Sequence, residues 1–90
     1  MNLAVLNFLQ KEFEKHSNSE DPSIIRKYLN DDISYLNPKV KLVDIDETLK
    51  WLKSYNVIRL TSSSVTLLKP HDLDEWVRKL QKRDAPDLTN

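Results

Sequence analysis

The side chains that could perform catalysis or bind a metal are few and scattered. His16 and His71 are the only histidines, and no spacing brings either one to further ligand-type residues or to an activated nucleophile. Asp44 and Asp46 could act as a carboxylate pair, but they lie at an expected helix start, where acids hydrogen-bond to amides. The chain also has no glycine, which excludes the phosphate-binding and nucleophile-elbow motifs that need it. We therefore expect no enzyme activity, no cofactor and no metal.

Basic residues offer a second chemistry, the neutralisation of nucleic-acid phosphates. The 14 Lys and Arg residues equal the 14 Asp and Glu residues, so attraction to phosphate must come from a local patch. Residues 38–70 hold six basic and three acidic residues, whereas the segments on both sides are net acidic. The candidate nucleic-acid contacts in this segment are Lys41, Lys50, Lys53, Ser54, Arg59, Ser63 and Lys69.

Two helices are expected before this segment. Apolar residues recur at helical spacing over residues 2–16, which predicts the first helix. Asp21-Pro22 supplies a capping side chain followed by proline at the first helical position, so the second helix should begin there. Its expected buried residues are Ile24, Ile25, Tyr28 and Leu29. A second short turn through Ile33 and Leu36 could follow it.

The basic segment itself predicts a third helix. Val40–Val43 alternates weakly and is either a brief strand or an extended connector. Asp44 and Glu47 match a capping box, so a helix should run over residues 44–55. Its apolar stripe is Ile45, Leu49 and Leu52. Asn56 can then adopt the left-handed conformation that glycine usually takes at a helix end.

A hairpin and a last helix should complete the fold. Period-two patterns predict strands over residues 57–61 and 65–69, and the serines between them favour a loop of about three residues over a tight primed turn. A second capping box predicts a helix from Asp72 to Arg83. Its apolar stripe is Leu73, Trp76, Val77 and Leu80.

The expected fold class is α+β and mostly helical. It consists of a three-helix core with a two-stranded β-hairpin and a C-terminal helix, in one domain over residues 1–83. Residues 84–90 should form a frayed tail.

This order of elements resembles the winged-helix (winged helix-turn-helix) fold over residues 3–69, with the last helix as an addition. The resemblance implies that residues 44–55 form a recognition helix, that residues 61–64 form the wing, and that the domain contacts DNA in transcription or replication. Two features depart from the family pattern. Residues 30–43 separate the second and third helices, where the usual turn has about 3 to 4 residues. The short β segment, normally between the first two helices, would have to be residues 40–43.

Two alternatives remain open for the third helix. Its outer face alternates acids and bases, which is also typical of a solvated face with Asp46 and Lys50 as an i,i+4 pair. Trp51 and Tyr55, together with Trp76 of the last helix, are either core residues or exposed anchors for a partner.

The last helix is the candidate for protein contact. Its basic residues could bind phosphates, or they could only complement the helix dipole. The candidate partner-binding residues are Trp76, Arg78, Lys79 and Lys82. The alternative to DNA contact is therefore a winged-helix protein-interaction domain in a multi-subunit assembly, or a homodimer formed through this helix.

The cellular location is inferred from what the sequence lacks. It has no cysteine, no run of about 20 apolar residues, and no basic segment before the apolar residues at its start. We expect an intracellular protein, cytoplasmic or nuclear, that does not bind membranes.

Overall fold

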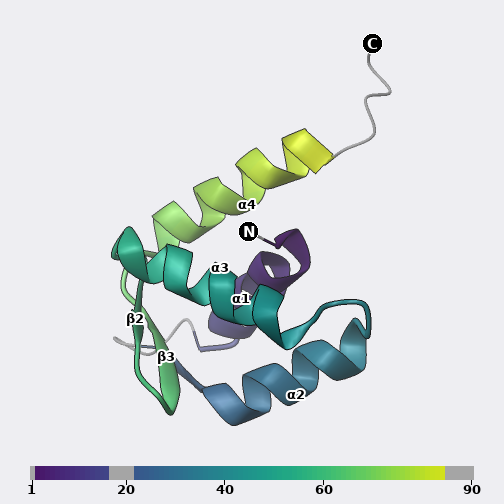
Figure 1. The fold of residues 1–90 in the computed structure, drawn as a ribbon. Coiled ribbons are helices and arrows are strands. Elements are labelled where there is room, and N and C mark those ends of the chain that lie inside the picture. The colour runs from purple at the N-terminus through teal and green to yellow at the C-terminus, as the bar shows by residue number, and fades with distance from the viewer. Residues whose placement is uncertain (1, 17–21, 85–90) are drawn as a thin grey trace.

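The computed structural model describes residues 2–16 and 22–84 of the chain. Within them, helices pack with a three-stranded antiparallel sheet (Figure 1). The elements follow in the order α1 (Leu3–Glu14), β1 (Ser23–Ile25), α2 (Arg26–Leu36), α3 (Leu42–Ser54), β2 (Ile58–Leu60), β3 (Ser64–Leu67) and α4 (Pro70–Asp84). The strand order is β1-β3-β2, so the last strand lies in the middle of the sheet. The chain is thus α+β and mostly helical, as predicted.

The sheet has one strand more than the predicted two-stranded hairpin. Ser23–Ile25, expected inside the second helix, forms β1 and pairs with β3, with Ile24 opposite Val65. The Leu67 N–H extends this contact by donating to the Pro22 carbonyl at 2.9 Å. The prediction of two strands was wrong because a three-residue strand carries little pattern of its own and depends on a partner strand far along the chain.

The start of α2 is also a correction. The helix begins at Arg26 rather than at Asp21-Pro22, and Asp21 lies outside the described residues. Strand geometry turns Ile25 away from the core, and Tyr28 lies on the outer side of α2. Both were expected to be buried, and they are 55% and 60% exposed.

The connection between α2 and α3 is much shorter than predicted. α2 continues through Leu36, including the turn that was expected to be separate, and residues 37–41 alone lead to Leu42 at the start of α3. Residues 40–43 therefore form no strand.

Helices α3 and α4 each begin two residues before the predicted position. The Asp44 carboxylate lies in the first turn of α3 and accepts the Lys41 N–H at 3.0 Å. Pro70 is the first residue of α4, where its missing N–H is no loss, and the Leu73 N–H donates to the Lys69 carbonyl at 3.2 Å. Asp44 and Asp72 were expected to precede their helices as capping residues. Both instead lie in the first turn, where a negative charge stabilises the helix dipole. The frayed tail was predicted over residues 84–90, but Asp84 is the last residue of α4, and residues 85–90 lie outside the described residues.

Asn56 links α3 to the hairpin as predicted. Its φ is 60°, the left-handed conformation, and the Val57 N–H donates to the Leu52 carbonyl at 3.0 Å. The hairpin pairs Ile58 with Leu67 and Leu60 with Val65.

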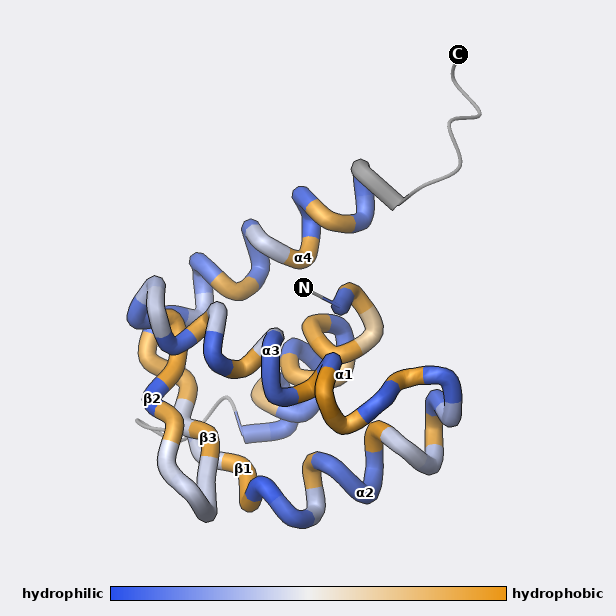
Figure 2. The backbone as a smooth tube through the Cα atoms, in the orientation of Figure 1, coloured by the Kyte–Doolittle hydropathy of each residue, from blue (hydrophilic) through white to orange (hydrophobic). Residues whose placement is uncertain are grey.

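One core joins the helices to the sheet. The helix α1 is the most apolar one in Figure 2 and packs against α3, α4 and β1. Its start is fixed by the buried Thr48 hydroxyl, which accepts the Asn2 N–H at 3.0 Å and donates to the Asp44 carbonyl at 2.8 Å. The largest fully buried side chains are Leu6, Leu9, Leu29, Ile33, Ile45, Leu49, Leu52, Ile58, Leu73, Val5, Val57 and Val65. No described helix is both long and apolar enough to span a membrane.

Candidate functional site

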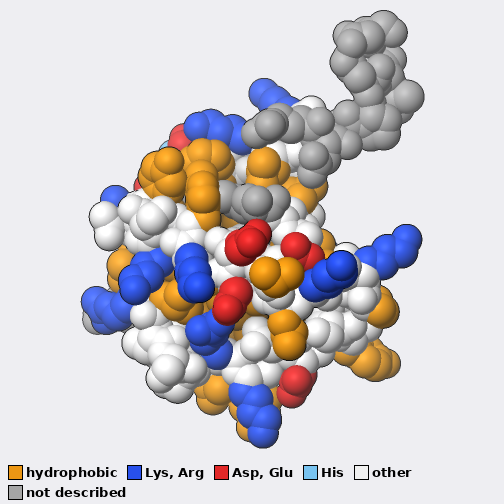
Figure 3. Space-filling model, viewed as in Figure 1, with side chains coloured by type: hydrophobic (Ala, Val, Ile, Leu, Met, Phe, Trp, Pro, Cys, Tyr) orange, Lys and Arg blue, Asp and Glu red, His pale blue; other side chains and the backbone are white. Residues whose placement is uncertain are grey.

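Helix α3 presents its lysines on the side away from the core. Leu49 and Leu52 are fully buried, whereas Lys50 and Lys53 are exposed, as the helical wheel predicts. Figure 3 shows Lys and Arg side chains over the C-terminal half of α3 and the hairpin, while acidic side chains lie over the N-terminal half of the helix. On α3 itself, the exposed Lys50 and Lys53 therefore lie in the C-terminal half of the helix, which packs with the strand that carries Arg59.

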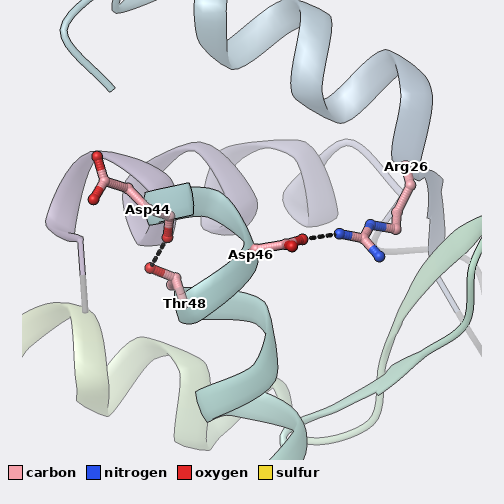
Figure 4. Close-up of polar contacts among 4 residues, drawn as sticks. All are labelled: Arg26, Asp44, Asp46 and Thr48. Carbon is pink, nitrogen blue, oxygen red and sulfur yellow. Dashed lines mark hydrogen bonds and ion pairs between the residues drawn. The ribbon is translucent and has the colours of Figure 1, made fainter. Parts of the chain in front are cut away.

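An ion pair between two helices changes the charge of this face. Arg26, at the start of α2, donates from its guanidinium to the carboxylate of Asp46 on α3 (Figure 4). The Arg26 side chain is 22% exposed and that of Asp46 is 49% exposed. The positive charge of Arg26 compensates the negative charge of Asp46, which would otherwise repel a phosphate bound next to Lys50. Arg26 was not among the predicted contacts, because no local pattern connects residues on different helices.

The loop between β2 and β3 is closed by a threonine hydroxyl. The Thr61 Oγ1 accepts the N–H groups of Ser63 at 3.2 Å and Ser64 at 2.9 Å, which lets the chain turn without glycine. The Ser63 carbonyl accepts the Arg26 N–H at 2.9 Å, so the loop is held against the start of α2. Arg59, opposite Thr66 in the sheet, is exposed on a strand that packs against α3.

The remaining predicted nucleic-acid contacts differ in position and in what they can donate. Lys41 is exposed just before α3, and a rise of ~1.5 Å per residue places it about 18 Å from the last turn of that helix. Lys69 is exposed at the base of the hairpin, where its N–H donates to the Val57 carbonyl at 3.1 Å. The Ser54 hydroxyl donates to the Trp51 carbonyl at 2.6 Å, so it can accept a hydrogen bond but has no proton left for a phosphate.

Three aromatic rings form a cluster where α3 meets α4. Trp51 lies 4.4 Å from Tyr55 and 4.2 Å from Trp76 between ring centroids, the latter pair edge to face. The two tryptophans are partly buried against the core, whereas Tyr55 is 54% exposed. The cluster is thus neither pure core nor a free anchor: its inner side stabilises the α3–α4 contact and its outer side meets solvent.

The basic residues of α4 are exposed. Arg78, Lys79 and Lys82 all face solvent, and the Lys79 Nζ lies 4.8 Å from the Trp76 ring centroid. This distance is typical of a cation–π contact. The predicted partner-binding residues therefore lie along one helix, with the Trp76 ring partly covered by Lys79.

An apolar groove between α1 and α2 was not predicted. It has a volume of about 250 Å³ and is lined by Ala4, Asn7, Phe8, Lys11, Ile33, Leu36 and Asn37. Leu36 is 68% exposed at its edge, and the neighbouring Tyr35 is 85% exposed. The sequence pattern through Ile33 and Leu36 gave no sign of this groove, because the groove depends on the angle between two helices.

No cluster of three or more His, Cys, Asp or Glu residues within residues 2–16 and 22–84 is arranged to hold a metal ion. Comparison of the chain with protein-family models, with curated proteins and with solved structures gave no match.

Proposed function

We propose that this protein is a non-enzymatic DNA-binding module of the winged-helix type, acting in transcription or replication. It contacts the duplex through the exposed side of α3 and the hairpin. The observation that carries the proposal is the combination of element order with charge: a helix, a strand, two helices and a hairpin, with the exposed bases on the third helix and the hairpin.

Two features of the structure support the proposal at the points where the sequence departed from the winged-helix pattern. The strand β1 lies between α1 and α2, where the family has its short β segment. Residues 37–41 form a connection close in length to the turn of about 3 to 4 residues in a helix-turn-helix. Both features support the presentation of α3 as a recognition helix.

Electrostatics support a contact dominated by phosphates. Lys50, Lys53 and Arg59 are exposed together on α3 and the adjacent strand, and Asp46 is offset by Arg26. Charge-assisted contacts to phosphate oxygens need only a cation within reach, and they position a protein on DNA without reading sequence.

Alanine substitution tests the proposed surface. Lys50→Ala and Lys53→Ala should each weaken binding to a labelled duplex. Each should also make the slope of log K against log salt shallower, by about the contribution of one phosphate contact. Lys11→Ala, an exposed lysine on α1, is the matched control and should leave affinity unchanged. Equal affinities for all four proteins would place the contact elsewhere and overturn the assignment to α3.

The groove between α1 and α2 favours a second candidate function, a protein-interaction domain within a multi-subunit assembly. Exposed apolar side chains beside a concave apolar surface are typical of partner-binding sites. A hydrophobic fluorescent dye should bind the wild-type groove, and Leu36→Ser should reduce that binding. Unchanged dye fluorescence in a folded variant would argue against this candidate.

A further inference from the structure

Helix α4 has its charges divided between its two halves. Over residues 72–82 the acids come first and the bases second: Asp72, Asp74 and Glu75, then Arg78, Lys79 and Lys82; Arg83 and Asp84 end the helix. Asp74 is already engaged with α1, because its carboxylate accepts a hydrogen bond from the Gln10 amide at 2.8 Å. Glu75, Arg78, Lys79 and Lys82 are exposed.

Three of these charges share one side of α4. At about 100° per residue, Asp72, Glu75 and Lys79 fall within roughly 60° of one another, next to Trp76 and away from Asp74. Glu75 and Lys79 are exposed, and Asp72 is partly exposed. This side, defined by Asp72, Glu75, Trp76 and Lys79, is here termed the charged face of α4.

We propose that a second copy of this chain binds the charged face through its own α4 in antiparallel orientation. Residues 75 and 79 are equally far from Val77 along the helix, and so are residues 72 and 82. Val77 itself is buried on the other side of the helix, so a two-fold axis would cross the charged face at the level of Val77 along α4. Such an axis places each acid opposite a base of the other copy: Glu75 opposite Lys79, and Asp72 opposite Lys82. Such a contact is self-complementary and closes at two copies. It does not depend on the proposed DNA-binding function.

The aromatic cluster supplies the apolar centre of this contact. Exposed ion pairs alone contribute little to association, so a stable dimer needs buried apolar area as well. Trp76 is only partly buried beside Val77, and Tyr55 next to it is 54% exposed. Pairing of two α4 helices would cover the outer side of this cluster with charges around it, which is the usual anatomy of an interface.

Within residues 2–16 and 22–84, Glu75 and Lys79 make only weak surface contacts inside one copy. Glu75 lies 3.2 Å from the Nε2 of His71, whose side chain is 82% exposed, and Lys79 lies over the Trp76 ring. Both contacts are at the surface, where such interactions are weak, so the side chains can exchange them for contacts with a second copy. Figure 1 shows that α4 runs along the outside of the molecule, and its C-terminal half extends beyond the other helices.

Sedimentation equilibrium of the full chain with a charge swap tests this proposal. The wild type should form a concentration-dependent dimer that weakens as salt increases. Glu75→Lys and Lys79→Glu each place like charges opposite one another twice per dimer, so each should raise the dimer Kd about tenfold or more. The double variant Glu75→Lys with Lys79→Glu restores opposite charges across the axis and should recover most of the affinity.

Lys27→Glu, an exposed charge reversal on α2, is the control and should dimerise like the wild type. Thermal melting verifies that the variants fold, which their exposed positions favour. Three results would each overturn the proposal: a monomeric wild type at all concentrations, a dimer insensitive to the single reversals, or a double variant no tighter than the singles.

Discussion

At the scale of single residues, Leu49 and Leu52 account for the orientation of α3. Both side chains are fully buried in the core beneath that helix, which fixes which of its residues face outward. Leu49→Ala or Leu52→Ala should destabilise the protein by ~2 to 5 kcal/mol, because each leaves a cavity in a well-packed interior. Lys50→Ala, between them on the outside, should change stability by less than about 0.5 kcal/mol. Thermal melting measures all three, and leucine variants that melt like the wild type would mean that α3 is rotated from its assigned orientation.

The ion pair of Arg26 with Asp46 gives a prediction with opposite effects on stability and binding. Asp46→Asn removes a negative charge next to Lys50 and frees the Arg26 guanidinium, so duplex affinity should rise. The slope of log K against log salt should also become steeper, by the amount that about one additional phosphate contact contributes. Stability should fall by at most ~1 kcal/mol, since both side chains are partly exposed. Asp31→Asn, an exposed acid on α2, is the control. A fall in affinity on fluorescence titration would show that Asp46 does not oppose DNA binding.

At the scale of elements, the turn from α3 into β2 depends on one conformation of Asn56. A residue with a side chain at φ 60° is disfavoured, and Asn tolerates this region better than most residues. Asn56→Ala should therefore cost ~1 kcal/mol or more in free energy of unfolding, whereas Asn56→Gly should be close to neutral. Chemical denaturation compares the two variants, and equal stabilities would show that the turn relaxes to another conformation.

The elements that sequence analysis predicted best are those whose signal is local. The stripe of Ile45, Leu49 and Leu52 and the left-handed Asn56 were both correct, because periodicity and backbone preference lie within a few residues. β1 was missed because Asp21-Pro22 matches a helix start, while the pairing with β3 comes from residues far along the chain.

In the candidate site, too, local features were predicted and features that depend on distant residues were not. Exposure of Lys50 and Lys53 was correctly expected, since it follows from the periodicity of α3. The compensation of Asp46 by Arg26 was not foreseen, because it requires α2 and α3 to be placed relative to each other. The same reason explains why the groove between α1 and α2 was missed.

At the scale of the whole molecule, a zero formal net charge coexists with a local basic surface. Long-range attraction to DNA is then weak, and binding must depend on the few cations close to the phosphates. We therefore expect a duplex affinity that is modest and strongly dependent on salt.

The most direct test of the proposed function is the affinity of the wild-type protein for a labelled duplex, measured by fluorescence anisotropy at low salt and again at a severalfold higher concentration. If Lys50, Lys53 and Arg59 each neutralise a phosphate, log K should fall with log salt with a slope of about −3, since each phosphate contributes roughly −0.9. No binding at low salt, where attraction to phosphate is strongest, or binding that does not change with salt, would contradict a DNA-binding role for α3 and the hairpin.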